Sequence, residues 1–297
     1  MNVLELFESF QTDEQAIAHL EAVRWRGHPV CPYCQSELVG RHASGDRANQ
    51  RWQCRACSRA FAVTVGTIFH GTHISLRKWF LVLALMVNAK KSASAYQIAR
   101  DLGMRRPTVW SMMHRVRMAM ANDEAQAGLL HGIVEADETY IGGKPRKGNR
   151  RDDDKPNKRG RGTKKVPVIG VTERLGRVVA KVAEAHEISA KGLDTFIRRT
   201  VDTAASFLIT DEFAAYRRVA SSMRSATINH KESYAEGDIH TNSIEGFWSL
   251  VKRAWYGQHH HYSRKYMPFY IAEACYKCNT RGATNGFGIL LNAMVAA

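Results

Sequence analysis

Three carboxylates in the second half of the chain have the order and spacing of a site that cuts nucleic acid. Asp137 closes one apolar run that predicts a strand, and Asp211 closes another at residues 206–210. Glu245 lies 34 positions after Asp211, in the first turn of a predicted helix. Acids that come from two strand ends and one helix suit a pair of divalent metal ions, Mg2+ or Mn2+.

Phosphodiester cleavage needs an activated water or hydroxyl and a stabilised leaving oxygen, and two ions about 3.5 to 4 Å apart can supply both. Each acid also has an ordinary structural interpretation. Asp137 can be a solvated strand end, Asp211 a helix N-cap, and Glu245 the partner of Asn242 in a capping box. The joint placement of the three acids in a basic chain favours catalysis.

The helix that carries Glu245 has further candidates on the same face. Asn242, Ser249 and Lys252 lie three, four and seven residues from Glu245, which places them beside it on a helix. We expect Lys252 to contact DNA phosphate next to the metal ions and Asn242 to be a further DNA contact. Trp248 suits either the core or a base-stacking role.

Four cysteines form two pairs with the spacing of zinc ligands. Cys31 and Cys34 are separated by two residues, and so are Cys54 and Cys57, with nineteen residues between the pairs. Four thiolates can surround one tetrahedral Zn2+ ion, and such a complete shell leaves no position for substrate. The alternative is four unrelated thiols. The paired spacing favours a zinc ribbon with a structural ion.

Residues 71–125 contain a pattern typical of a helix-turn-helix. Ala99, Gly103 and Val109 have the offsets of a small packing residue, a turn glycine and an apolar anchor, and the second helix is expected to begin near Pro107. An ordinary helical hairpin fits equally well, although the basic charge and the adjacent cysteines favour DNA. The outward positions expected to contact DNA are Arg105, Arg106, Thr108, Ser111 and Arg115.

The charge of the chain indicates a polyanionic partner. The 297 residues carry a formal net charge of +15, which favours nucleic acid first and a membrane surface second. The longest apolar run, residues 79–87, is about half of what membrane spanning requires. With no basic and apolar leader at the N-terminus, we expect a cytoplasmic protein without a membrane partner.

A basic segment follows the Asp137 strand directly. Residues 144–165 contain eleven Lys or Arg against three Asp. A solvated insertion is the structural interpretation, and binding of phosphate backbone without sequence specificity is the functional one. The candidate contacts are Lys144, Arg146, Lys147, Arg150 and Arg151.

The order of elements predicts the fold of the second half. We expect, in order, a strand with an acid, a hairpin over 166–182, a helix over 190–201, a second strand with an acid, a helix, a short strand and a helix with an acid. This order fits an α/β, RNase H-like sheet with flanking helices. We therefore expect four regions. They are an N-terminal helical segment (1–30), a zinc ribbon (31–70), a helix-turn-helix region (71–125) and a catalytic domain (130–290) with a basic insertion (144–165).

The chain resembles a transposase of the IS1595 family, with its ISXO2-like catalytic domain. The resemblance is carried by CPYC and CRAC, TVGTIFHGTHISLRKWF, VEADETYIGGK, LITDEFAAY and HTNSIEGFWSLVKR. It implies a bacterial DDE recombinase in which Asp137, Asp211 and Glu245 are the catalytic triad and Lys252 is the associated basic residue. The likeness further implies that the protein grips terminal inverted repeats on double-stranded DNA, cuts each end to a 3′-hydroxyl and joins it to target DNA. Pairing two ends would require a homodimer or a larger assembly.

Two other functions fit parts of the sequence. A zinc-ribbon and helix-turn-helix regulator would use the α/β domain for dimerisation only, and would not need the three acids. A nuclease of the same fold would cut without joining. The intact acids argue against the regulator, while the family motifs carry most of the case against the nuclease.

Overall fold

The structure is a computed structural model, and it describes residues 2–42, 51–143, 163, 165–228 and 240–295. The five candidate contacts in the basic segment, Lys144, Arg146, Lys147, Arg150 and Arg151, lie outside the described residues. The chain divides into two compact units, Met1–Asp123 with Gly282–Ala297 and Glu124–Arg281. Among the described residues, every helix is too short or too polar to cross a membrane.

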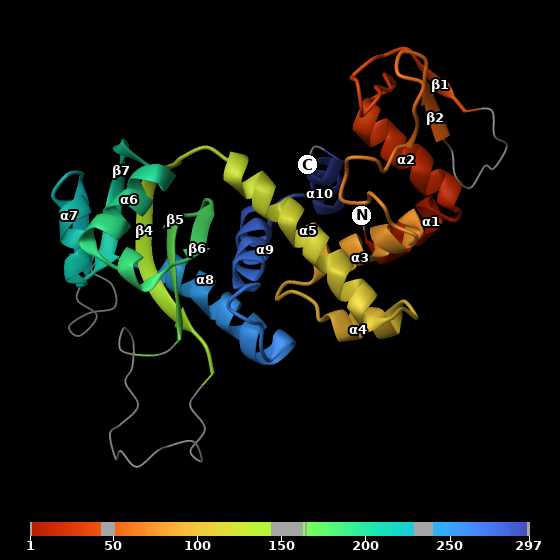
Figure 1. The fold of residues 1–297 in the computed structure, drawn as a ribbon. Helices are drawn as coiled ribbons and strands as arrows, with labels where there is room; N and C mark the ends of the chain where they lie inside the picture. Colours follow the sequence, from red (N-terminus) through yellow and green to blue (C-terminus); the bar gives the residue numbers. More distant parts are fainter. Residues whose placement is uncertain (1, 43–50, 144–162, 164, 229–239, 296–297) are drawn as a thin grey trace. The chain divides into compact units, whose positions relative to one another are not determined.

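The first unit begins with two helices, α1 (Val3–Ser9) and α2 (Asp13–Trp25), as the N-terminal pattern predicts (Figure 1). Asn2 and Thr12 cap them, each in a capping box with the residue three positions further on. These reciprocal bonds satisfy backbone N–H groups that a helix start leaves without partners. The first unit therefore starts with helices whose ends are fixed locally by the sequence.

A three-stranded antiparallel sheet follows. Its strands, in the order β1-β2-β3, are β1 (Val39–Arg41), β2 (Arg51–Cys54) and β3 (Ala60–Ala62). Glu21 on α2 accepts two bonds from Arg41 at 2.8 and 2.6 Å and one from the indole of Trp52 at 2.7 Å. The Arg41 guanidinium also lies over the Trp52 ring, 4.1 Å from its centroid. This buried carboxylate fastens the small sheet to α2.

The remaining helices of the first unit are α3 (Leu76–Asn88), α4 (Ala95–Asp101), most of α5 (Arg106–Gln126) and α10 (Gly286–Val295). α4 and α5 are joined by a turn in which Gly103 has a φ of +59°, and Ala99 and Val109 are buried on either side. α10 packs against α2 and α3, with Phe287 edge-on to Phe80 at 5.5 Å between ring centroids. The C-terminal helix thus completes the first core.

The second unit is built on a mixed five-stranded sheet with the order β6-β5-β4-β7-β8. Its strands are β4 (Leu130–Ile141), β5 (Val166–Glu173), β6 (Val178–Val182), β7 (Val201–Asp211) and β8 (Ser225–Ile228). β4, β5 and β6 pair antiparallel, whereas β7 is parallel to both β4 and β8. The first strand of the unit is therefore central, and the later strands add on either side of it.

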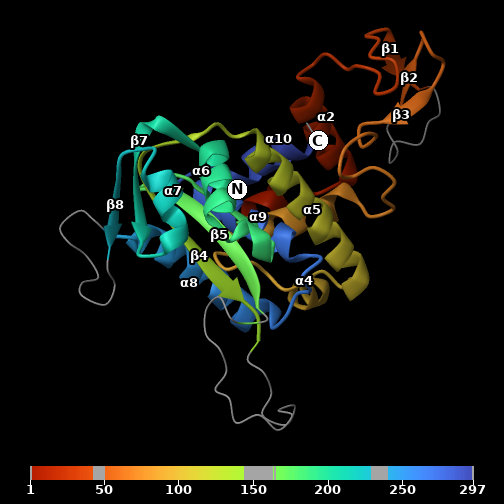
Figure 2. The ribbon, with the colours of Figure 1, turned by 60° about the vertical axis from the view of Figure 1, so that its left-hand side comes forward.

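Helices cover both faces of this sheet (Figures 1 and 2). The helical elements are η4 (Ala185–Glu187), α6 (Ala190–Thr200), η5 (Ala214–Tyr216), α7 (Arg217–Ala220), α8 (Asn242–Arg253), the π-helical η6 (Ala254–His259) and α9 (Met267–Asn279). One buried core lies between the sheet and α6, η5 and α7, and a second lies between the sheet and α8, η6 and α9. The result is a three-layered α/β/α unit, which confirms the mixed α/β class.

Three local expectations need correction. β4 does not end at Asp137 but continues to Ile141, because β5 pairs with it along its whole second half. The helix expected directly after Asp211 consists of the short η5 and α7. The third is the capping box that was the structural alternative for Asn242 and Glu245: it is absent, since Asn242 is already inside α8 and the N-cap residue Thr241 makes no side-chain capping bond.

Candidate functional site

The parallel pairing of β4 and β7 brings two distant acids together. Ala136 is the register partner of Thr210, so Asp137 and Asp211 follow on adjacent strands. Both carboxylates line a pocket of about 550 Å³. The neighbouring strand β7 ends at Asp211, which opens space beside Asp137 although β4 continues past it. Residues 74 positions apart in the sequence thereby share one site.

Glu138 is a further acid in the pocket, beside the three that the sequence predicts. Glu138 offers a carboxylate oxygen that lies with those of Asp137 and Asp211 in a group whose members are all within 4.8 Å of one another. The hydroxyl of buried Tyr216 donates to Glu138 at 3.4 Å. The sequence signal for Glu138 is the acid run EADE, residues 135–138. Within this run, only Asp137 has the position that the family motif gives to a catalytic residue. Glu245 lies outside this group of three.

Crowding of these acids changes their ionisation. Burial, together with the negative charges of Glu138 and Asp211, raises the pKa of Asp137 from about 3.8 to about 7. The pKa of Tyr216 is also raised, chiefly by burial and then by the charge of Glu138. A divalent cation would relieve this repulsion, because it favours the charged form of every carboxylate around it. The donor set, carboxylate oxygens, is the one that Mg2+ and Mn2+ prefer.

Trp248 fixes the orientation of Asp137. Its indole N–H donates to Oδ2 of Asp137 at 3.0 Å. The ring reaches this position because Gly170, the partner of Asp137 on β5, has no side chain, and a Cβ there would lie 2.7 Å from the Trp248 ring. Trp248 is 2% exposed. Of the two roles expected for it, the structure gives a core position that also orients a candidate metal ligand.

α8 supplies the opposite side of the pocket. Glu245, Ser249 and Lys252 line it at intervals of one helical turn, so these three members of the expected face lie in one site with Asp137 and Asp211. Asn242 is exposed on the first turn and is not among the lining residues. The Thr241 hydroxyl donates to Oε1 of Glu245 at 3.1 Å, which holds that carboxylate near the start of the helix.

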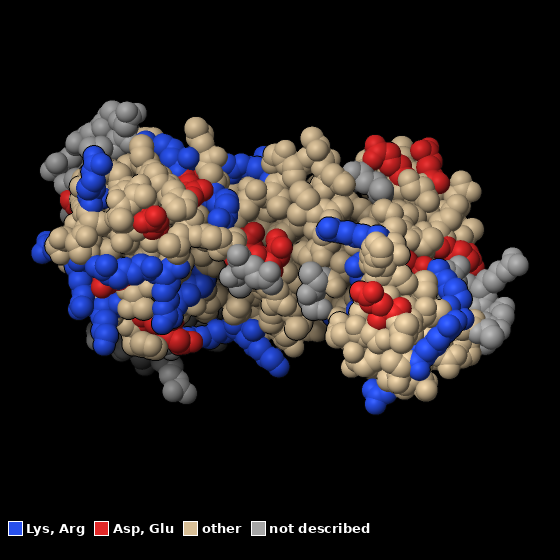
Figure 3. Space-filling model, turned by 90° about the horizontal axis from the view of Figure 1, so that it is seen from above, with Lys and Arg blue, Asp and Glu red and all other residues tan. Residues whose placement is uncertain are grey.

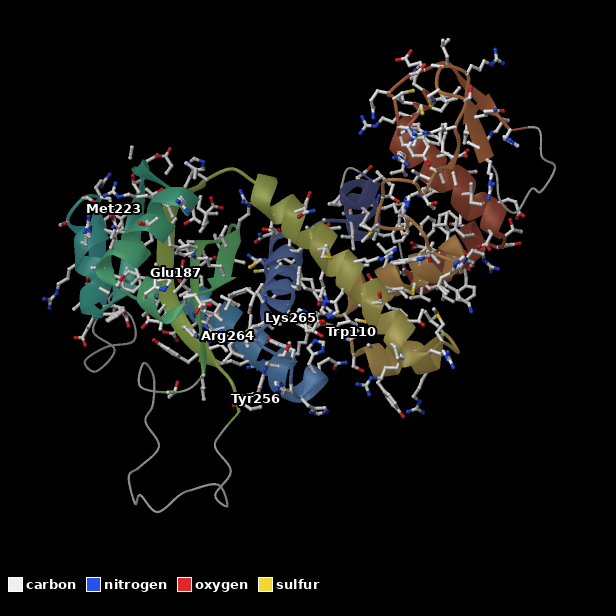
Figure 4. The ribbon with its side chains drawn as sticks, viewed as in Figure 1. Trp110, Glu187, Met223, Tyr256, Arg264 and Lys265 are labelled. Atoms are coloured by element: carbon white, nitrogen blue, oxygen red, sulfur yellow. The ribbon has the colours of Figure 1, made fainter. Side chains whose placement is uncertain are left out.

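Two further lining residues, Arg253 and Tyr256, were not predicted. Tyr256, labelled in Figure 4, lies just beyond α8 in η6 and is 52% exposed. The buried Trp255 meets it edge-on, with 4.7 Å between ring centroids. An exposed ring beside two cationic side chains combines a stacking surface with positive charge, the two features that single-stranded nucleic acid binding uses. The sequence contains a signal for Tyr256: Lys252 lies seven residues after Glu245 and Tyr256 four residues after Lys252, so the three follow the helical period.

The four expected zinc ligands also lie together. The Cys31 and Cys57 sulfurs are 3.7 Å apart, and the Cys34 and Cys54 sulfurs are 3.6 Å apart. Zinc–sulfur bonds of about 2.3 Å at tetrahedral angles separate sulfurs by about 3.8 Å, so the four thiols fit one ion. The residue after each pair, Gln35 or Ser58, has a positive φ near the left-handed region, of 60° and 59°. The two turns are therefore equivalent, and the tetrad fits a zinc ribbon.

Hydrogen bonds to these sulfurs favour the thiolate at one position. The backbone N–H of Cys57 lowers the pKa of Cys54 to about 7, with help from the N–H of Ala56 and against burial. Since zinc binds thiolate and not thiol, this prepares a ligand for the ion.

The candidate DNA contacts of the first unit have different surroundings. Arg105, Arg106 and Ser111 are exposed at the start of α5, and Thr108 is half-buried. Arg115 is half-buried, and its guanidinium donates to the backbone carbonyls of Ile68 at 3.0 Å and His70 at 2.9 Å. Arg115 therefore has a structural use within its own unit, whereas the other four face outward or lie partly exposed.

Basic side chains also occur among the described residues of the second unit. Figure 3 shows Lys and Arg side chains over much of one face of the second unit, on the left, with fewer Asp and Glu among them. Exposed arginines of this unit include Arg199, Arg217 and Arg224. The Cys275 thiol on α9 is buried, and burial raises its pKa.

Comparison with known proteins identifies the family. Residues 129–279 match the model of the ISXO2-like transposase domain of the IS1595 type, and residues 11–60 match the transposase zinc-ribbon domain of the same family. A protein of the transposable element ISH50 from Halobacterium salinarum is 30% identical over 278 residues, which cover 89% of this chain and 90% of that protein.

Solved structures are more distant. A pre-cleavage Mos1 transpososome is 13% identical with a TM-score of 0.31, over 72% of this chain and 77% of that one. The Mos1 strand transfer complex is 12% identical with a TM-score of 0.30, over 73% and 75%. Scores of this size do not establish a shared fold, so the assignment depends on sequence. A domain model that matches half of the chain, and a relative that matches nearly all of it, show that the chain belongs to the IS1595 family of transposases, with an ISXO2-like transposase domain.

Proposed function

We propose that this transposase cuts the DNA ends of a mobile element and joins them to target DNA at the pocket between β4, β7 and α8. The observation that carries the proposal is that Asp137, Asp211, Glu245 and Lys252 line one pocket. The strand order and pairing of the second unit support an RNase H-like sheet, which would present such acids at the end of β7.

Asp137 and Asp211, with Glu138 beside them, would hold one divalent ion, and Glu245 would help to hold a second. When bound, such ions would activate the attacking hydroxyl and stabilise the charge on the leaving oxygen. The Trp248 indole keeps Asp137 in a fixed orientation. Lys252 and Arg253, which are exposed at the pocket, would attract and position the phosphate.

The two reactions are chemically balanced. In the first, water attacks the phosphorus, the P–O3′ bond breaks, and the products are a 3′-hydroxyl and a 5′-phosphate. In the second, that 3′-hydroxyl attacks a phosphodiester of the target, so one P–O bond forms as another breaks. Neither reaction needs an oxidant or a covalent bond to the protein.

Binding of the element ends is proposed for the first unit. The exposed start of α5, with Arg105, Arg106 and Ser111, would enter DNA as the second helix of a helix-turn-helix, next to a zinc ribbon held by one structural ion. The basic segment 144–165, which follows β4, would bind phosphate backbone. Two ends must be paired before joining, so we propose that a homodimer or larger assembly acts on the DNA.

Carboxylate substitutions test the catalytic proposal. We expect Asp211→Asn and Glu245→Gln each to lower transposition of a marked element by at least about 100-fold, since each removes a metal ligand. The matched control is Glu212→Gln, because Glu212 adjoins Asp211 but is exposed and does not line the pocket. Unchanged transposition by both variants, with DNA binding retained, would favour the regulator; cleavage without joining by the wild type would favour the nuclease.

Metal binding is expected to stabilise the protein and to depend on pH. Without metal, the raised pKa of Asp137 means that the folded state holds a proton more tightly than the unfolded chain, so stability falls as pH rises from about 4 to about 7. Saturating Mn2+ at pH 7.5 should therefore raise the Tm of the wild type, by about 5 °C. Asp137→Asn should remove most of both effects in thermal melts with EDTA or Mn2+. Equal responses in the two proteins would contradict this site.

The exposed ring of Tyr256 is expected to contact an unpaired base near the cleaved bond. Tyr256→Ala should weaken binding of an element end with a short single-stranded tip about tenfold, because stacking on one base contributes about 1 to 3 kcal/mol. Tyr256→Phe keeps the ring and should bind like the wild type. Fluorescence anisotropy measures both affinities. A loss in the Phe variant as large as in the Ala variant would show that stacking is not the role of this residue.

Zinc content tests the proposed structural ion. We expect the purified protein to carry about one zinc per chain, and Cys31→Ser to lose it and to lower the Tm of the first unit. Cys278→Ser is the control, because Cys278 belongs to the second unit and its sulfur accepts a hydrogen bond from Arg281. Elemental analysis gives the stoichiometry. Equal zinc content in the wild type and Cys31→Ser would exclude this tetrad as the site.

A further inference from the structure

A buried carboxylate that the catalytic proposal does not use lies two residues before Asp137. Glu135 is in the middle of β4 and is 0% exposed. Residues two apart on a strand face the same side of a sheet, so Glu135 and Asp137 both point toward α8. Burying a carboxylate costs free energy unless hydrogen-bond donors surround it. The donors around Glu135 therefore indicate which parts of the chain it holds together.

Glu135 binds the first turn of α8 directly. Its Oε2 accepts the backbone N–H of Ser243 at 2.8 Å and that of Ile244 at 3.1 Å. Its Oε1 accepts the Ser243 hydroxyl at 3.0 Å. These N–H groups belong to the end of the helix where the macrodipole favours a negative charge. A strand side chain thus takes the place of the capping bond that Thr241 does not make.

The charge of Glu135 is balanced from the β5–β6 turn. Arg174 donates to Oε1 through Nε and Nη2, each at 3.2 Å, and it also donates to the His240 carbonyl at 3.3 Å. The His240 ring lies 3.4 Å from the same carboxylate oxygen. Arg174 and His240 are themselves mostly covered. The network therefore joins three parts of the chain: β4, the β5–β6 turn and the entry to α8.

We propose that Glu135 is a positioning residue, which sets the distance between the acid on α8 and the acids on the sheet. Glu245 lies one residue after Ile244, and Asp137 lies two residues after Glu135. One carboxylate thus fixes both the helix turn that carries Glu245 and the strand that carries Asp137. This inference depends on the proposed metal site, since it assigns Glu135 the role of holding that site's two sides in register.

Glu135 does not itself hold the metal. Both of its oxygens already accept hydrogen bonds, it is not among the residues that line the pocket, and it is outside the group of three clustered acids. Its effect on the reaction must therefore pass through α8 and β4. Groups that orient metal ligands in this way commonly change metal affinity by about 10- to 100-fold when they are altered.

The decisive variant is Glu135→Gln, which preserves size but replaces one oxygen with an amide donor. In either orientation of the Gln amide, its NH2 group faces groups that also donate: the N–H groups of α8 in one, and the guanidinium of Arg174 in the other. We expect the Mn2+ concentration for half-maximal cleavage of an element end to rise about tenfold or more. The same shift should appear without DNA, as weaker Mn2+ binding in calorimetry.

Ser243→Ala is the milder variant in case Glu135→Gln does not fold, because it removes only the bond from the hydroxyl. It should shift the half-maximal Mn2+ concentration about threefold, in the same direction. The matched control is Ser189→Ala, which removes the side-chain cap of α6, a helix that bears none of the pocket residues. That control should lower the Tm without changing Mn2+ dependence at temperatures well below the transition.

The outcomes separate the two proposals. If the wild type shows neither cleavage nor Mn2+ binding that requires Asp137 and Asp211, the proposed function itself fails. If the wild type shows both and Ser243→Ala and Glu135→Gln match it, Glu135 has no positioning role. The same conclusion follows if these variants only lower the Tm, as Ser189→Ala does, because a purely structural role would leave Mn2+ dependence unchanged.

Discussion

Repulsion between neighbouring carboxylates is the constraint on which the second unit depends. Asp137, Glu138 and Asp211 lie close enough for their oxygens to share one ligand, and burial adds to the cost of charging them. Each of these carboxylates alone favours solvent, so holding them together costs free energy that other parts of the fold must offset. The parallel register of β4 and β7 forces the two aspartates together, and the free energy for this comes from the apolar cores on both faces of the sheet.

α8 solves a different problem, which is to bring a helix acid to a fixed place above a sheet. Two contacts set its position. Trp248 sits against Gly170 and donates to Asp137, while the first turn of α8 binds Glu135. The two contacts lie little more than one turn apart on the helix, so together they define both its rotation and its height above β4. Glu245 lies between them, and its location is therefore fixed from both sides.

The sequence predicts those parts of the site whose chemistry requires a fixed spacing between residues. The two cysteine pairs, the acids after apolar runs and the face of Glu245, Ser249 and Lys252 could all be predicted, because zinc coordination and helical periodicity act over short separations. Glu138 and Glu135 were missed because their roles come from partners 78 and 108 residues away, Tyr216 and Ser243. Tyr256 was missed because the π-helical turn after α8 continues the pocket face beyond the predicted helix end.

Diffraction from crystals soaked in Mn2+ tests the central claim most directly, because anomalous scattering locates the ion without reference to activity. We expect a peak within about 2.2 Å of carboxylate oxygens of both Asp137 and Asp211, which disappears in Asp211→Asn crystals under the same conditions. A peak elsewhere with this pocket empty at saturating Mn2+, or a peak that survives Asp211→Asn unchanged, would contradict the assignment of these carboxylates as the metal site.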